Sequence, residues 1–207
     1  MGRRWVILAL VALAAFAAAF VLASQGDDDG DTRSDLDLEG LDALTVEARE
    51  LVRLADQGGE VAHHAVYEQS GGDRLEVWTD GERLREETTP ADGPRRLLLR
   101  TDDEDLVCLE EAASWSCEDA TDEADGVQTR IEQLVVDLVG VEVTVRDGTV
   151  AGAEVRCFEA GEGEELVEVC LTRVGILARL AAGSARLELV DLDDDVGDDH
   201  FDAPEQV

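Results

Sequence analysis

Four cysteines are the residues of this chain whose type and spacing point most directly to chemistry. Cys108, Cys117, Cys157 and Cys170 have neither a CxxC-like spacing nor nearby histidines, which argues against a zinc site. An even number of cysteines in a chain expected to face an oxidising space favours two disulfides. Three pairings are possible, and we favour Cys108–Cys117 with Cys157–Cys170, because each pair flanks a short stretch typical of a hairpin. Each closed loop of about ten residues would stabilise the fold by roughly 2–3 kcal/mol.

The histidines and serines do not form a catalytic set. His63 and His64 are adjacent in an expected strand, so their side chains point to opposite faces and cannot bind one ion together. The acidic run 191–197 departs from a calcium-binding loop in the position of its glycine and in lacking the final glutamate. No serine has the Gly-x-Ser-x-Gly setting of a hydrolase. We therefore expect no enzymatic activity, no catalytic residue, no cofactor and no bound metal.

The charge of the chain restricts its partners. Fifty Asp and Glu residues face 17 cationic residues, all of them arginine, and the formal net charge is −33. Such a surface repels phosphate backbones and anionic headgroups, which excludes nucleic-acid binding. The acids are spread along the chain, which favours adaptation to a saline or alkaline exterior over a dedicated cation-binding surface.

The first 26 residues are expected to be a membrane anchor or signal segment. Arg3 and Arg4 precede an uncharged apolar run of 19 residues from Trp5 to Ala23, about one bilayer crossing at roughly 1.5 Å per residue. The positive-inside rule places everything after this run outside the cytoplasm. The run is longer than a signal core of roughly 7–15 residues, so we favour an uncleaved single-pass anchor in the cell membrane. Cleavage after Ala23, which would give a secreted protein, is the alternative.

An acidic linker, residues 27–40, then leads to one α+β domain, residues 41–207. Apolar residues at three- and four-residue steps from Leu41 to Ala55 predict an amphipathic helix that ends at Gly58-Gly59, and a second such helix is expected over 126–139. Asp80-Gly81 and Asp147-Gly148 predict hairpin turns, the first a two-residue type I′ turn. About ten short strands form a meandering antiparallel sheet with the helices on one side. They are expected at 61–69, 74–79, 82–88, 95–101, 106–109, 115–117, 141–146, 149–158, 166–172, 176–180 and 185–192.

Several of these motifs occur in an order that resembles a known family. Leu106-Val107-Cys108 and Trp115-Ser116-Cys117 form an expected hairpin, Cys170 leads to Gly175-Ile176-Leu177-Ala178-Arg179, and His200-Phe201-Asp202-Ala203-Pro204 closes the chain. This order is similar to that of exported actinobacterial members of the LolA-like superfamily of lipoprotein carriers, which includes the LppX and LprG lipoproteins and the amino-terminal domain of RseB. The resemblance, over about residues 41–204, implies a curved antiparallel sheet, a half-open barrel, with helices covering its apolar concave face.

The resemblance also implies a function, the binding of lipid or lipoprotein acyl chains in that concave face. An acyl chain gains roughly 0.8 kcal/mol for each methylene removed from water. The alternative is an envelope-sensing or assembly module that binds a membrane-protein partner without lipid, as RseB-like domains do. Anchoring without a lipobox cysteine suits such a stationary sensor. The expected lining residues, each of which is also an ordinary core position, are Leu44, Leu51, Val66, Val77, Leu97, Leu99, Ile131, Leu134, Leu138, Leu187 and Leu189.

The two interpretations of the acidic surface differ in their response to salt. If the acidity is a general adaptation, screening of self-repulsion raises the melting temperature with ionic strength, equally for NaCl and CaCl₂ at matched ionic strength. A far larger rise with CaCl₂, measured by thermal denaturation, would instead indicate cation binding.

Overall fold

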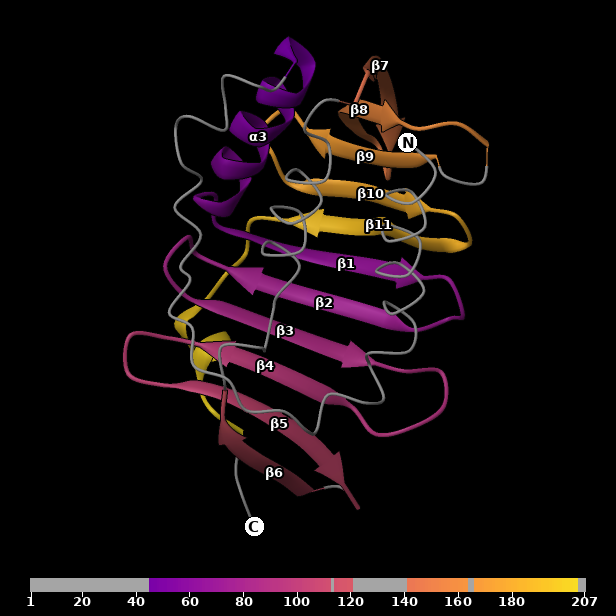
Figure 1. The fold of residues 1–207 in the computed structure, drawn as a ribbon. Coiled ribbons are helices and arrows are strands. Elements are labelled where there is room, and N and C mark those ends of the chain that lie inside the picture. Colours follow the sequence, from indigo (N-terminus) through magenta and orange to yellow (C-terminus); the bar gives the residue numbers. More distant parts are fainter. Residues whose placement is uncertain (1–44, 113, 121–140, 164–165, 205–207) are drawn as a thin grey trace, which may run out of the picture.

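The computed structural model describes residues 45–112, 114–120, 141–163 and 166–204. These residues form one α-helix, eleven strands and a short 3₁₀ helix, η2 (Asp198–Phe201). All eleven strands belong to a single antiparallel sheet with the order β6-β5-β4-β3-β2-β1-β11-β10-β9-β8-β7, which is curved and unclosed (Figure 1). The strands are β1 (His63–Gln69), β2 (Arg74–Thr79), β3 (Leu84–Thr89), β4 (Arg96–Arg100), β5 (Asp105–Glu111), β6 (Ser114–Asp119), β7 (Val143–Val150), β8 (Ala153–Ala160), β9 (Val167–Thr172), β10 (Leu177–Ala182) and β11 (Ala185–Asp193).

The pairing of β1 with β11 joins two local meanders into this one sheet. All the remaining strand pairs join strands that follow one another in the sequence. They form one meander from β1 to β6 and a second from β7 to β11. In the β1–β11 ladder His64 lies opposite Asp193 and Tyr67 opposite Leu189, with a register shift between Val66 and Tyr67. The antiparallel, meandering sheet that the sequence predicts is therefore present.

Helix α3 (Val46–Gly59) begins at Val46 rather than at Leu41, where its apolar pattern starts. Thr45 has an extended backbone, and its hydroxyl accepts a hydrogen bond from the backbone N–H of Ala48 at 3.2 Å, which is the geometry of an N-cap. From there the predicted spacing holds, and the helix ends at Gly59 as expected. Its buried face consists of Ala48, Leu51, Leu54, Ala55 and Gly58.

One face of the sheet packs against α3 and is called the helix face below. The helix lies over the end of the sheet that contains β7 to β11 (Figure 1). The chief core of the protein joins the two, with Leu51 and Ala48 from the helix and Tyr67, Phe158 and Leu171 from the strands. The helix predicted over 126–139, the linker and the N-terminal segment lie outside the described residues.

Two predicted hairpin turns differ from those observed. Asp147 and Gly148 lie inside β7, where they pair with Arg156 and Val155. The turn falls instead at Ala151-Gly152, whose positive φ angles of 48° and 80° suit a type I′ turn. Shifting the turn lets all eight residues of β7 pair with β8, which a turn at Asp147-Gly148 would prevent.

At Asp80-Gly81 the hairpin is in the predicted place, but its loop has four residues because Thr79 pairs with Leu84. The Asp80 carboxylate accepts hydrogen bonds from the backbone N–H groups of Glu82 and Arg83, at 3.1 and 2.7 Å. It also accepts one from the Arg83 guanidinium at 2.7 Å. These local bonds stabilise the longer loop and hold the pKa of Asp80 below its usual value, against the opposing effect of desolvation.

Two glycines let α3 approach the β9–β10 turn at backbone contact. Gly175, in that turn, has a φ of +93°. A Cβ atom there would lie 1.8 Å from the Leu54 carbonyl oxygen, and one on Gly58 would lie 2.2 Å from the Gly175 carbonyl oxygen. The close packing of α3 against the β9–β10 turn therefore requires glycine at both positions.

We expect Gly175→Ala to destabilise the protein by more than about 3 kcal/mol, since the new methyl group would push the helix backbone away from the sheet. Gly152→Ala is the matched control, because Gly152 also has a positive φ but a Cβ added there would meet nothing within 4 Å. It should cost only about 1 kcal/mol of left-handed strain. Denaturant unfolding of both variants tests this, and equal losses would contradict the packing argument.

Candidate functional site

The helix face is apolar from β9 to β2, whereas on β3 and β4 it also carries Glu86, Arg96 and Arg100. Side chains alternate between the two faces of a strand, and the register places Tyr67, Val77 and Leu189 on the helix face together. Leu98 extends this face onto β4, since it lies opposite Glu86 of β3, which in turn lies opposite Val77. The Tyr67 hydroxyl donates a hydrogen bond to the Leu177 carbonyl at 3.0 Å. Burial, with the nearby Glu86 carboxylate, raises the pKa of Tyr67 well above its usual value.

The structure brings together some of the expected lining residues. Leu51, Val77 and Leu189 belong to the chief core on the helix face, and Leu187 packs against it. Leu44, Ile131, Leu134 and Leu138 lie outside the described residues.

Three other expected lining residues lie on the opposite face. Val66 alternates with Ala65 and Tyr67 in β1 and lies opposite Glu76. Leu97 and Leu99 form a second, smaller core with Leu106, Cys108 and Phe201. The expected residues therefore do not form one surface. The sequence could not separate Leu97 and Leu99 from Leu98 because all three are buried, so β4 shows no polar alternation.

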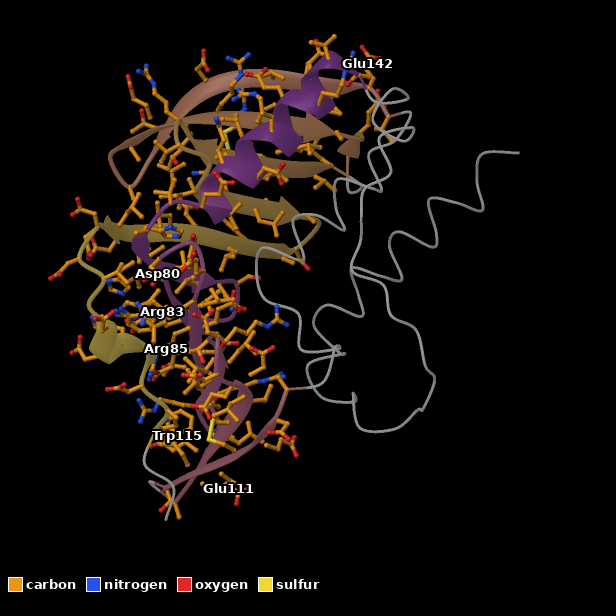
Figure 2. All side chains as sticks on the ribbon, turned by 90° about the vertical axis from the view of Figure 1, so that its left-hand side faces the viewer. Asp80, Arg83, Arg85, Glu111, Trp115 and Glu142 are labelled. Carbon is orange, nitrogen blue, oxygen red and sulfur yellow. A yellow bond between two sulfur atoms is a disulfide. The ribbon has the colours of Figure 1, made fainter. Side chains whose placement is uncertain are left out.

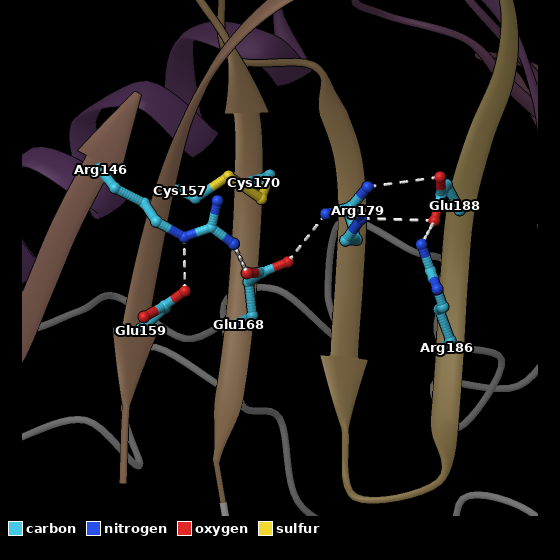
Figure 3. The surroundings of a disulfide bond; sticks show 8 residues. All are labelled: Arg146, Cys157, Glu159, Glu168, Cys170, Arg179, Arg186 and Glu188. Carbon is cyan, nitrogen blue, oxygen red and sulfur yellow. Dashed lines mark hydrogen bonds and ion pairs between the residues drawn. A yellow bond between two sulfur atoms is a disulfide. The ribbon is translucent and has the colours of Figure 1, made fainter. Parts of the chain in front are cut away.

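The opposite face carries most of the ion pairs of the described sheet and is called the charged face below. An alternating row of side chains crosses β7 to β11 beside the Cys157–Cys170 disulfide (Figure 3). Arg146 contacts Glu159 at 2.5 Å and also pairs with Glu168; Glu168 contacts Arg179 at 3.3 Å. Arg179 contacts Glu188 at 3.3 Å, and Glu188 also pairs with Arg186. The row offsets acidic charge locally, although each exposed pair contributes little by itself.

Each disulfide links two residues that lie directly opposite each other on neighbouring strands, and the pairing is the one favoured from the sequence. Cys108 and Cys117 join β5 to β6, and Cys157 and Cys170 join β8 to β9. The Glu168 carboxylate lies beside the second pair of sulfur atoms. Because those sulfur atoms are bonded to each other, they offer no thiolate to a metal ion.

The last described segment of the chain packs on the charged face of the sheet. After β11, residues 194–204, which we call the strap, cross to the side of the sheet opposite α3 and lie over β3 and its neighbours (Figures 1 and 2). Phe201 is only 5% exposed and contacts the second core, and Val196 packs against the same core. The signal for this packing was present in the sequence, as two apolar residues within an acidic run.

The strap places His200 against Trp78, which His64 of the neighbouring strand already contacts. Trp78 of β2 is stacked between His64 of β1 and His200 of the strap, with ring centroids 4.7 and 5.6 Å apart. His64 Nδ1 lies 3.1 Å from an Asp193 carboxylate oxygen, and its Nε2 lies 3.5 Å from Glu76. Sequence reasoning missed this cluster because its members are up to 136 residues apart in the chain.

His63 lies on the helix face, as expected from its position next to His64. Its Nδ1 is 2.7 Å from the Val61 carbonyl oxygen. Burial lowers the pKa of His63, so the imidazole is held neutral and its Nδ1–H donates to that carbonyl. The two adjacent histidines therefore serve separate faces.

No protein-family model and no curated protein matches the chain. Within the described residues, no helix combines the length and the apolar character needed to cross a bilayer. The predicted anchor, residues 5–23, lies outside those residues. The fold and these two faces are thus the observations on which a function must rest.

The ion pairs of the charged row should make the stability of the fold depend on pH. The hydrogen bond from Arg146 is the largest cause of a lowered pKa at Glu159. A lowered pKa in the folded state means that the stabilisation is present above the unfolded pKa, about 4.5, and is lost as the pH falls through the folded value. Glu159→Gln should therefore lower stability at pH 7 but make progressively less difference below about pH 4.5.

Urea unfolding from pH 3 to pH 7 measures this. Arg146→Gln is the partner in a double-mutant cycle, and adding Glu159→Gln to it should cost less than Glu159→Gln costs in the wild type. A difference between wild type and Glu159→Gln that stays constant across the pH range would contradict the assignment.

Proposed function

We propose that this protein is an extracytoplasmic, membrane-tethered binding domain of LolA-like type, which holds lipid or lipoprotein acyl chains against the helix face of a half-open barrel. The observation that carries the proposal is the separation of chemistry between the two sides of one curved, unclosed sheet. The helix face is apolar from β9 to β2 and becomes mixed on β3 and β4, where Glu86, Arg96 and Arg100 share it with Leu98. The charged face carries the row of ion pairs across β7 to β11 (Figure 3). A curved sheet with an apolar concave side and a helix over one end suits an elongated apolar ligand.

The position of α3 favours the part of the helix face furthest from it as the binding region. The helix lies over the β7–β11 end (Figure 1). On the same face, Leu75 and Val77 of β2 and Leu98 of β4 are buried apolar side chains, with Glu86 of β3 between them. An acyl chain lying along these strands would gain roughly 0.8 kcal/mol per buried methylene. The strong negative charge of the protein would keep an anionic headgroup outside the sheet.

A second candidate function is a sensing or assembly module that binds a membrane-protein partner and carries no lipid. The packing beneath α3 favours it, because Leu51, Tyr67 and Phe158 are almost completely buried in one continuous core. Side chains buried this completely leave little accessible surface for a ligand at that end of the sheet. The two functions therefore differ in what occupies the β2–β4 end.

Two adjacent leucines of β4 provide a test with a matched control. Leu98 faces the helix side and is 7% exposed, whereas Leu99 faces the other side and is fully buried. The full chain, produced with its disulfides in a membrane-containing host, would be labelled with a photoactivatable palmitic acid analogue and analysed by intact mass. Leu98→Asn should reduce the labelled fraction at least about fivefold, because a polar amide on the helix face costs about 1–3 kcal/mol of apolar binding.

Leu99→Asn should destabilise the fold as much or more, yet leave the labelled fraction of the folded protein unchanged. Mapping of the labelled peptides should place the label on β2 to β4. Absence of labelling in the wild-type chain would contradict acyl-chain binding and favour the partner module.

A further inference from the structure

The strap is held by one buried aromatic side chain and by several more exposed contacts. Phe201 is the only buried side chain of η2, while the Asp198 side chain is 93% exposed. His200 adds its stacking contact with Trp78. Segments with few buried contacts open with low free energy compared with the core of a fold.

Phe201 packs against side chains of the sheet itself, and the surface formed by the residues named in this paragraph is called the groove below. Leu97, Leu99 and Leu106 come from β4 and β5, and the Cys108–Cys117 disulfide links the strands that form its floor. Trp78 and Trp115 pack against this cluster from β2 and β6. These strands pair with one another through their own ladders and not through the strap.

Two arginines contact the strap where it lies on this surface. Arg83 contacts the Asp198 carboxylate at 2.8 Å and places its guanidinium 4.3 Å from the centre of the Phe201 ring. Arg85 donates to the backbone carbonyls of His200 and Asp202 at 3.2 and 3.3 Å. The two arginines thus contact an acidic side chain, an aromatic ring and two main-chain carbonyls of the strap. Other peptides can present the same groups.

We propose that this groove is a docking site for peptides in which a phenylalanine is flanked by acidic residues, and that the strap occupies the site in cis. Arg83 also pairs with Asp80 in the β2–β3 loop, and Arg85 pairs with Glu87 of β3, which holds both guanidinium groups in place for such a segment. A tethered strap competes at an effective concentration of about a millimolar, so a partner peptide gains access only when the strap is released. The proposal concerns the charged face and does not depend on acyl-chain binding to the helix face.

The test uses the full chain with both disulfides and a fluorescently labelled peptide of residues 194–204, followed by fluorescence anisotropy. Wild-type chain should bind the peptide weakly, because its own strap fills the groove. Phe201→Ala in the chain removes the anchor and should tighten peptide binding at least tenfold. The same peptide with its phenylalanine replaced by alanine should not bind either chain.

Further variants keep the test decisive. Adding Arg83→Gln to the Phe201→Ala chain should weaken peptide binding at least threefold. If the Phe201→Ala chain fails to fold, His200→Ala leaves the anchor in place and weakens only the stack on Trp78, and it should tighten peptide binding by about threefold. A wild-type dimer that Phe201→Ala abolishes would support the site and show that a second copy can supply the segment.

Two results would overturn the proposal. One is a folded Phe201→Ala or His200→Ala chain that binds the peptide no more tightly than wild type does. The other is equal binding of the peptides with and without phenylalanine. Either would show that the strap is only a structural cover of the second core.

Discussion

The ladder between β1 and β11 is the constraint on which the rest of the structure depends. All other strand pairs in the described sheet can form as local hairpins or neighbouring strands of a meander, at small loop-closure cost. The β1–β11 pair brings together residues more than a hundred positions apart, such as His64 and Asp193. It turns two small sheets into one surface broad enough to have two distinct faces.

The same ladder fixes where the strap begins. Since Asp193 ends β11 beside His64, the chain that follows emerges next to Trp78 of the neighbouring strand. His200 can then stack on Trp78, and Phe201 can reach the second core over β4 and β5. The register of one strand pair therefore positions both the apolar helix face and the groove on the other side.

Charge is arranged differently on these two sides. Beneath α3 the helix face buries a large apolar core, and its ionisable side chains Glu86, Arg96 and Arg100 lie on β3 and β4. The charged face keeps its acids in contact with arginines, as in the row from Arg146 to Arg186. A protein of net charge −33 gains from this pattern, because scarce cations are placed between acids that would otherwise repel one another.

Local patterns predicted much of the fold. The apolar spacing of α3, the strand positions, the opposite directions of His63 and His64 and the two hairpin-closing disulfides follow from interactions between residues close in sequence. Errors arose where local signals compete. Asp147-Gly148 has the composition of a turn, but a longer pairing of β7 with β8 places these residues within a strand.

Residue type and short-range periodicity by themselves determined the antiparallel meander, the cysteine pairing and the amphipathic helix, because each depends on neighbours within about 15 positions. Only the tertiary structure decided which of three consecutive buried leucines in β4 faces α3 and which contacts Phe201. It also decided that an acidic chain end lies on the sheet beside Trp78. These outcomes depend on the register of strands far apart in the sequence, and the hydrophobic character of a residue does not encode which partner buries it.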